Sequence, residues 1–283
     1  MCSALALAAG CGTRMLLHME TKPLGNGLVL FEGGAGNSTA LLHGDDVFLV
    51  DTKMGDFALR LQRELEEDGA DRSVRRVLLT HAHVDHTLGL QRFHEVGVVL
   101  LQTNALRRMQ ARESSFLRDQ TYAVVEDHVT LQLGGEEVRI FHPGVAHTDG
   151  DLCAYFPSRK LLIAGDLWNH GLEPEADFRY GGNILALRKA YDVLLALDFD
   201  KVIPGHGSVG TKADVQRNRD YLMAMEAAVW EAIRRGDTEE DAVKKVTMAE
   251  WPEYDPVPFY ATRELNVRMM YRTLKTGPDS AHE

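Results

Sequence analysis

The sequence predicts an α/β fold in which two β-sheets pack against each other and helices cover the outer faces. Three observations support it: short apolar runs between glycine-rich breaks, amphipathic stretches with helical spacing, and the same order of strands and then helices in each half of the chain. With 283 residues, 45% hydrophobic and 26% charged, the chain is long enough for one large domain or two intimately packed ones. A sandwich built only from strands does not fit this pattern.

The first half begins with strands. We expect them at residues 28–31, 37–42 and 47–51, because glycine- and aspartate-rich breaks between short apolar runs are typical of hairpins. The break at residues 33–36 contains three glycines, but no Lys-Ser/Thr pair follows and no helix begins there, so a turn fits better than a phosphate-binding loop. An amphipathic helix at 55–69 should then cover one face of this sheet.

The remaining elements alternate between short apolar runs and helical patterns. We expect further strands at 76–80, 97–101, 129–133, 138–141, 152–156, 161–164 and 201–203, and helices at 86–96, 104–112, 184–197, 212–235 and 260–275. Residues 113–127 show no clear period, which fits either a loop or lid beside the site or an ordinary surface excursion. We expect an N-terminal segment at 1–22 and one domain at 23–283, made of two similar halves at about 23–145 and 146–283.

The composition excludes some classes of partner. Aspartate and glutamate outnumber lysine and arginine by 42 to 31, so the formal net charge is −11 and no basic face for nucleic acid is expected. No apolar stretch approaches the roughly 18 to 20 residues that span a membrane. Three cysteines cannot form a disulfide framework. A small-molecule substrate is therefore the expected partner.

The first eleven residues end like a bacterial lipoprotein cleavage site, with small residues just before Cys11. They lack a basic region and are short for a signal peptide. The two readings are the remnant of an export signal and an apolar tail without function. The predicted location is accordingly either cytoplasmic or exported.

The stretch from Thr80 to His86 directly follows the apolar run 77–79 and places His81, His83, Asp85 and His86 within six residues. Imidazoles and a carboxylate at the end of a buried strand lose their hydration, and this loss costs free energy unless a cation or another partner compensates for it. The ends of α/β strands are also where such folds place ligand sites. This stretch therefore predicts a metal site.

Three segments of the second half supply further ligand-type residues beside glycines. They contain His147 (followed by Thr148-Asp149-Gly150-Asp151), Asp166 (preceded by Ala164-Gly165) and His206 (within Pro204-Gly205-His206-Gly207). Glycine permits close backbone approach and unusual loop geometry there.

Taken together, Asp51, His81-x-His83-x-Asp85-His86, His147, Asp166 and His206 occur in the order of the motifs of the metallo-β-lactamase-fold hydrolases, which the sequence resembles over about residues 37–207. The sequence from Val202 to Gly207 is similar to that of a bacterial branch of this superfamily. The resemblance implies an αββα four-layer sandwich with two mixed sheets face to face and a metal groove at one edge.

The resemblance also implies a ligand set. His81, His83 and His147 would hold one Zn²⁺, Asp85, His86 and His206 the other, and Asp166 would bridge them. Two zinc ions per chain are expected, although iron or manganese would suit the same ligands. At position 166, where some lactamases have cysteine, this sequence has an aspartate, and in this respect it resembles glyoxalase II and lactonases. Asp51 resembles the aspartate that orients a ligand histidine in this family.

The expected chemistry is hydrolysis of an ester, thioester, lactone or β-lactam carbonyl by a zinc-bound hydroxide, because metal binding lowers the pKa of water to about 7 or 8. Asp85 would orient the water or pass a proton to the leaving group. Two alternatives are a phosphodiesterase of the same fold and a catalytically silent zinc-binding module. Trp168, His170, Tyr180 and Asn183 are candidates for the substrate pocket, although packing or helix capping is the better explanation for each.

Two short segments depart from the family pattern. Thr52 and Lys53 follow Asp51 where a glycine is frequent, and Thr87-Leu88-Gly89 follows His86 in place of the usual glycine pair. Both lie next to motif residues, so we expect them to reshape the groove.

Overall fold

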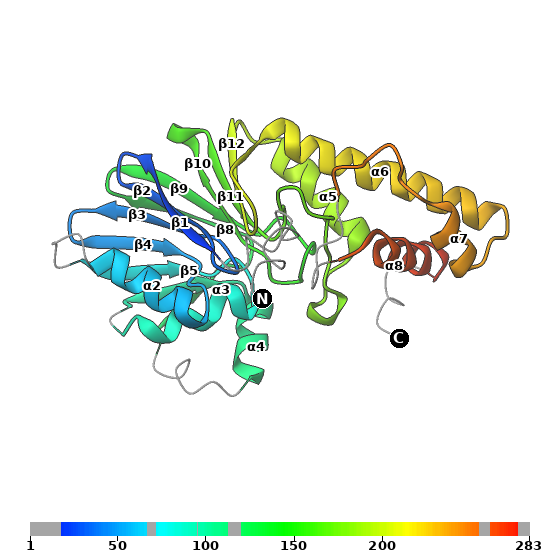
Figure 1. Ribbon diagram of the computed structural model, residues 1–283. Coiled ribbons are helices and arrows are strands. Elements are labelled where there is room, and N and C mark those ends of the chain that lie inside the picture. Colours follow the sequence, from blue (N-terminus) through cyan, green and yellow to red (C-terminus); the bar gives the residue numbers. More distant parts are fainter. Residues whose placement is uncertain (1–17, 67–71, 95, 113–119, 255–260, 277–283) are drawn as a thin grey trace, which may run out of the picture.

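The computed structural model describes residues 18–66, 72–94, 96–112, 120–254 and 261–276 (Figure 1). Two sheets divide the strands between them in chain order. The first sheet consists of β1 (Met19–Gly25), β2 (Leu28–Gly33), β3 (Ser38–His43), β4 (Asp46–Val50), β5 (Ser73–Leu78), β6 (Val98–Leu101) and β7 (Tyr122–Val124). The second consists of β8 (His128–Leu133), β9 (Glu136–Phe141), β10 (Cys153–Phe156), β11 (Leu161–Gly165), β12 (Lys201–Pro204) and β13 (Gly210–Thr211).

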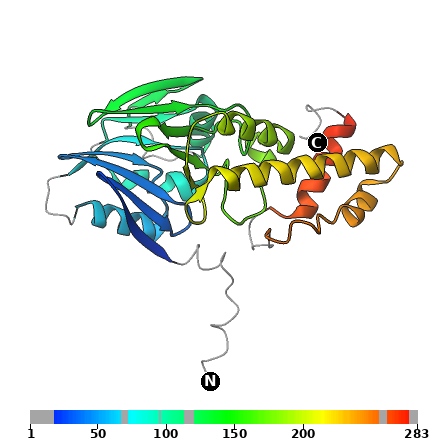
Figure 2. The same cartoon turned by 90° about the horizontal axis from the view of Figure 1, so that it is seen from above.

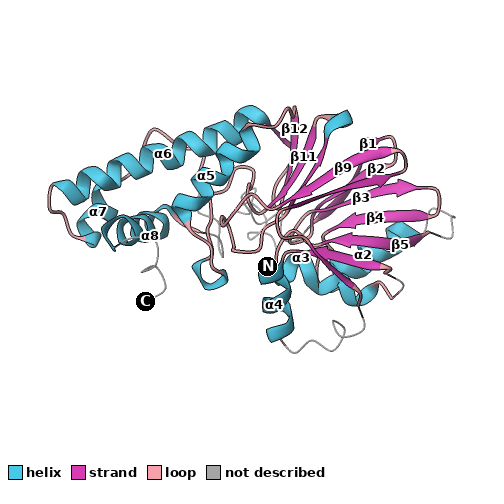
Figure 3. Ribbon diagram, turned by 180° about the vertical axis from the view of Figure 1, so that it is seen from behind, coloured by secondary structure: helices cyan, strands magenta, loops and turns pink. Residues whose placement is uncertain are grey.

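Both sheets are mixed. In the first, β1 to β4 are antiparallel and β4 to β7 are parallel; in the second, only β11 and β12 run parallel. The helices of the described residues are α2 (Gly55–Glu66), α3 (Val84–Thr87), α4 (Thr103–Ala111), α5 (Ile184–Leu195), α6 (Lys212–Arg234), α7 (Glu239–Lys245) and α8 (Arg263–Thr276). Seen from above, the two sheets lie against each other (Figure 2), and α5 to α8 gather beside the second sheet, away from α2 and α4 (Figure 3).

Three apolar cores explain this layering. Alternate residues of a strand point to opposite faces, so Phe48 and Val50 of β4 enter the core between the sheets while Leu49 packs under α2 with Leu61. On the far side, Leu162 of β11 packs in the core shared with α5 and α6. The predicted fold class, two mixed sheets face to face with helices outside, is confirmed.

The N-terminal boundary differs from the prediction. Strand β1 begins at Met19, inside the expected 1–22 segment, and pairs with β2 across a turn in which Asn26 and Gly27 both have positive φ. Most β1 side chains are at least partly exposed, so the strand lacks the apolar pattern that identified the others. The predicted signal-like stretch ending at Cys11 lies outside the described residues.

The division into halves also shifts. The chain passes from the first sheet to the second between β7 and β8, before the boundary expected at 145. Within the segment 113–127, residues 113–119 lie outside the described part, whereas β7 pairs with β6 in parallel as an ordinary edge strand. Strand β13 and helix α7 were not expected from the sequence.

The helix expected at 86–96 is shorter. It forms one α-turn, α3, and then a 3-10 turn at Leu88–Arg92. The backbone of Gly89 packs on Thr52, where a Cβ would lie 1.9 Å from the Thr52 carbonyl oxygen, and its N–H donates to the Lys53 carbonyl. This tight contact fixes the chain beside the motif. No helix of the described residues is long and apolar enough to cross a membrane.

Candidate metal centre

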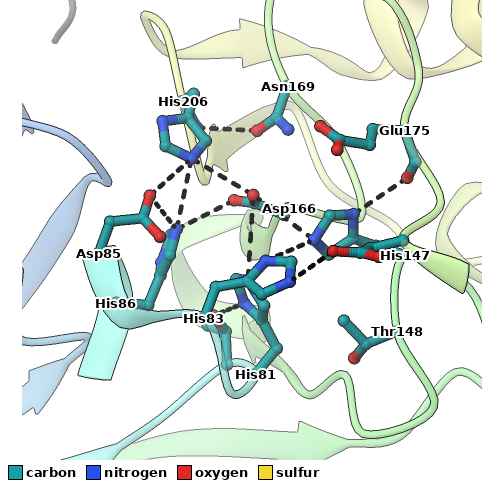
Figure 4. A network of polar contacts seen from close by, with 12 residues as sticks. His81, His83, Asp85, His86, His147, Thr148, Asp166, Asn169, Glu175 and His206 are labelled. Atoms are coloured by element: carbon teal, nitrogen blue, oxygen red, sulfur yellow. Dashed lines mark hydrogen bonds and ion pairs between the residues drawn. The ribbon is translucent and has the colours of Figure 1, made fainter. Parts of the chain in front are cut away.

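The predicted metal ligands come together at one edge of the sandwich. Parallel strands β4 and β5 end beside each other at Asp51 and at the Thr80 to His86 stretch, and parallel strands β11 and β12 end at Asp166 and His206. Because the carboxyl ends of parallel strands meet at one edge, the sheet topology gathers these side chains. His147, from the loop between β9 and β10, completes the group (Figure 4).

The first cluster contains three imidazoles whose nitrogens converge. His83 Nδ1 lies 3.0 Å from His81 Nε2 and 3.1 Å from His147 Nε2. With Asp166, these residues offer ligand atoms that all lie within 4.8 Å of one another. The arrangement presents three nitrogens to a single point.

The opposite nitrogen of each ring has its own acceptor. His81 Nδ1 lies 3.0 Å from Thr80 Oγ1, His83 Nε2 3.2 Å from an Asp177 carboxylate oxygen, and His147 Nδ1 3.0 Å from the Glu175 carbonyl. If each outer nitrogen carries the proton, the converging nitrogens present lone pairs. Three lone pairs facing one another repel unless a cation lies between them, so the donor set fits a metal ion.

The second cluster has the same design with a carboxylate. His86 Nε2 and His206 Nε2 are 3.4 Å apart, and Asp85 Oδ2 lies 3.5 Å and 3.3 Å from them. On the outer side, His86 Nδ1 faces Asp51 Oδ2 at 2.8 Å and His206 Nδ1 faces the Ala35 carbonyl at 3.1 Å. These three ligand groups also lie within 4.8 Å of one another.

Asp166 lies between the clusters, at the centre of Figure 4. Its oxygens are 3.2 Å from His86 Nε2 and 3.3 Å from His206 Nε2, and 3.7 to 3.9 Å from the His147 and His81 nitrogens. Gly205 makes room for it, because a Cβ at this position would lie 1.7 Å from Asp166 Oδ1. This placement suits a carboxylate shared by two cations.

Asp51 connects the two clusters on the side of the imidazole rings that faces away from the converging nitrogens. Its carboxylate accepts from the Thr80 N–H at 2.8 Å, from Thr80 Oγ1 at 2.7 Å and from His86 Nδ1. Since the Thr80 hydroxyl donates to Asp51, it is free to accept from His81 Nδ1. Asp51 therefore holds one histidine of the second cluster directly and one of the first through Thr80.

The pKa values of the cluster histidines shift in different directions, because more carboxylates face the second cluster than the first. Burial lowers the pKa of His147 to about 4, so its ring is neutral, as a metal ligand must be. Burial also opposes charging of His206, but Asp166 and Asp85 outweigh it and raise its pKa to about 9. Burial acts likewise on His86, where Asp166, Asp85 and Asp51 raise the pKa well above its ordinary value. The second cluster thus attracts positive charge strongly.

A cavity of about 470 Å³ opens onto both clusters. Its wall contains His83, Asp85, His147, Asp166 and His206 from the clusters, together with Ala35, Met54, Val84, Glu175, Asp177, Arg179 and Tyr180. The Tyr180 ring packs edge-on against His83, with a centroid separation of 4.4 Å. A small molecule in this cavity would lie directly against the candidate ligands.

Of the four residues considered for the pocket, Tyr180 lies on this wall. Trp168 is buried in the core beneath α5 and α6, and His170 stacks on Trp168 with Nδ1 2.8 Å from the Ser208 carbonyl. Asn183 caps α5 by accepting from the N–H groups of Leu185 and Ala186. Trp168, His170 and Asn183 do not contribute to the cavity wall, and the structure gives these three residues packing or capping contacts.

Two residues at the site carried no sequence signal. Asp177 holds His83, and the hydrogen bonds from His83 and Arg179 outweigh burial and keep the Asp177 pKa well below its usual range. Glu175 lines the cavity, and burial, with Asp166 and Asp177 nearby, raises its pKa to about 7. Both lie in a loop without a motif, and only the fold brings them to the clusters.

Comparison with known proteins agrees with this geometry. The family model of the metallo-beta-lactamase superfamily matches residues 31–206. A metallo-beta-lactamase type 2 of Bacillus cereus is 25% identical over 193 residues, which cover 66% of this chain and 72% of that protein. The human acyl-coenzyme A thioesterase MBLAC2 is 27% identical over 228 residues, covering 65% of this chain and 80% of that protein. The crystal structure of DIM-1 metallo-beta-lactamase superposes with a TM-score of 0.62 at 19% identity, over 73% of this chain and 97% of that chain, which shows a shared fold.

Proposed function

Because the chain belongs to the metallo-beta-lactamase superfamily of metal-dependent hydrolases, we propose that it is a dinuclear zinc hydrolase acting on an ester, thioester, lactone or β-lactam carbonyl. The observation that carries the proposal is the pair of adjoining clusters, His81/His83/His147 and Asp85/His86/His206, with Asp166 between them and one cavity in front. Similarity to a β-lactamase and to an acyl-coenzyme A thioesterase supports a carbonyl substrate.

Two bound zinc ions would supply a water acidic enough to lose its proton near neutral pH and Lewis-acid polarisation of the substrate carbonyl. The chain's own part is to hold these ligands in fixed orientations. Every imidazole of the two clusters has its outer nitrogen held, by Thr80, Asp51 or Asp177 or by a backbone carbonyl, so none rotates freely.

Asp85 is the candidate residue for orienting the attacking water. It is the more exposed of the two cluster carboxylates, at 23% against 5% for Asp166, and it lines the cavity. Burial opposes its ionisation, but His86 and His206 hold its pKa well below the ordinary range. An ionised carboxylate facing the cavity can accept a hydrogen bond from an attacking water and orient it.

The test combines metal content with turnover. Purified protein should bind two zinc ions per chain and hydrolyse at least one substrate in a panel of esters, thioesters, lactones and β-lactams, with activity lost in chelator and restored by zinc. His83→Ala and Asp166→Ala should each lower kcat/KM by orders of magnitude while the far-UV circular dichroism stays unchanged. Full activity in a verified zinc-free sample would refute the proposal. Turnover confined to a phosphodiester control, or tight zinc binding without any turnover, would replace it with one of the alternatives.

A further inference from the structure

Lys53 is a fully buried lysine directly behind the second cluster. Its side chain has no exposed area, and its ammonium donates to three backbone carbonyls, those of Phe31 at 2.9 Å, Gly33 at 2.6 Å and Gly36 at 2.7 Å. An ammonium has three N–H donors, so every donor is used. Burial of this ammonium is unfavourable and lowers its pKa to about 7, so the three hydrogen bonds to the backbone are what hold it at this position.

Two of these carbonyls, those of Phe31 and Gly33, belong to the end of β2, and the third, that of Gly36, belongs to the loop that leads from β2 into β3. Ala35 of this loop accepts from His206 Nδ1, and Gly36 lies so close to His86 that a Cβ there would be 2.7 Å from the imidazole ring. Asn37 completes the contact by donating from its side chain to the carbonyls of Pro204 and Gly207, on either side of His206. The position of this loop therefore sets the position of His86 and His206.

The backbone around Lys53 serves the same cluster. Thr52 donates from its N–H and from Oγ1 to the His86 carbonyl, at 2.7 Å and 3.0 Å, and the Lys53 carbonyl accepts from the Gly89 N–H at 2.7 Å. Lys53 has a left-handed backbone, with φ of 59°, which turns its side chain under the loop. A non-glycine residue held in this region is strained and persists where surrounding contacts demand it.

The first cluster is supported from elsewhere. His83 is held by Asp177 and His147 by the Glu175 carbonyl, both from the loop that precedes α5. None of the hydrogen bonds described for Lys53 reaches His81, His83 or His147. Apart from Asp51 and Asp166, which contact both clusters, the two metal sites thus have separate supports, one centred on Lys53 and one on Asp177.

We propose that Lys53 is a positioning residue that forms the Asp85/His86/His206 site in advance of metal binding by fixing the loop from Gly33 to Asn37. The inference rests on the proposed function, because it needs two metal sites. Its consequence is selective: loss of the ammonium weakens zinc binding at this site and leaves the His81/His83/His147 site intact.

The experiment measures each site alone. His83→Ala leaves the second site as the stronger one, and His206→Ala leaves the first; Lys53→Met is then placed in each background and zinc affinity is measured by competition with a chromophoric chelator. We expect Lys53→Met to weaken zinc binding about 10- to 100-fold in the His83→Ala background, the loss typical of removing a group that orients a ligand. In the His206→Ala background the affinity should change less than about threefold. Asp177→Asn, as the matched control, should give the reverse pattern.

Two further variants keep the test decisive if Lys53→Met does not fold. Lys53→Gln retains two donors and should lose less affinity than Lys53→Met, whereas Gly36→Ala pushes the loop from His86 with Lys53 intact and should reproduce the selective loss. Equal affinity with and without Lys53, or equal losses in both backgrounds, overturns the inference. If the unmodified chain binds fewer than two zinc ions, the proposed function itself fails, so the two failures are distinguishable.

Discussion

The contacts of Asp51 make the sharpest prediction, for the substitution Asp51→Asn. Asp51 is buried, and its left-handed φ of 58° is one that asparagine adopts readily, so the backbone should tolerate the change. The carboxylate Oδ2 accepts from both Thr80 Oγ1 and His86 Nδ1. The Thr80 N–H is a fixed donor and keeps the amide oxygen in the place of Oδ1, so the amide nitrogen takes the place of Oδ2 and faces the Thr80 hydroxyl and His86 Nδ1 as a donor.

The magnitude follows from these two bonds. A hydrogen bond to a charged group contributes about 1.5–3 kcal/mol, so losing both would cost about 3–6 kcal/mol. His86 can recover one by shifting its proton from Nδ1 to Nε2, which leaves a cost of about 1.5–3 kcal/mol. That shift puts a proton on the nitrogen that faces His206 and the metal site. Zinc affinity at the second cluster should therefore fall about 10- to 100-fold.

Two assays check the prediction. Urea denaturation in chelator measures the loss of unfolding free energy, and zinc competition with a chromophoric chelator measures the affinity. Asn183→Ala is a suitable control, because it removes a helix cap that does not line the cavity. Asp51→Asn protein that binds both zinc ions with unchanged affinity would show that the Asp51 to His86 contact does not set the tautomer.

Three further predictions concern packing, protonation and capping. Gly205→Ala places a Cβ against Asp166, so we expect zinc stoichiometry by elemental analysis to fall below two; a full complement would contradict the geometry. Glu175 has a folded pKa of about 7, above its ordinary value of 4.5, so the chelator-treated protein gains stability from its protonation below about pH 4.5 and loses it as the pH rises through 7. Glu175→Gln should flatten this part of the stability profile in urea denaturation, and an unchanged slope would exclude Glu175 as its source. Asn183→Ala should cost about 1 kcal/mol of unfolding free energy through the lost cap and leave KM unchanged, whereas a raised KM would assign Asn183 to the substrate site.

Much of the fold could be predicted because its strands are buried on one or both faces. Apolar runs such as β4, β10 and β11 carry the pattern that reveals them, and the glycine-containing breaks mark their ends. Strand β1 could not be predicted, because it lies at an exposed edge of the sheet and its sequence therefore lacks an apolar pattern. The helix after His86 was overestimated because the contact of Gly89 with Thr52 imposes a 3-10 turn that no local pattern records.

The sequence by itself determined which side chains are candidates for the metal centre. Ligand-type residues at strand ends are a local property, and the ends of parallel strands must meet. Apart from Asp51, only the tertiary structure decided which groups hold the imidazoles: Asp177 holds His83, the Ala35 carbonyl holds His206, and Lys53 lies beneath the loop that carries Ala35. These partners lie far apart in the chain and act through backbone carbonyls or a single carboxylate, so their roles depend on three-dimensional proximity, which no spacing along the sequence encodes.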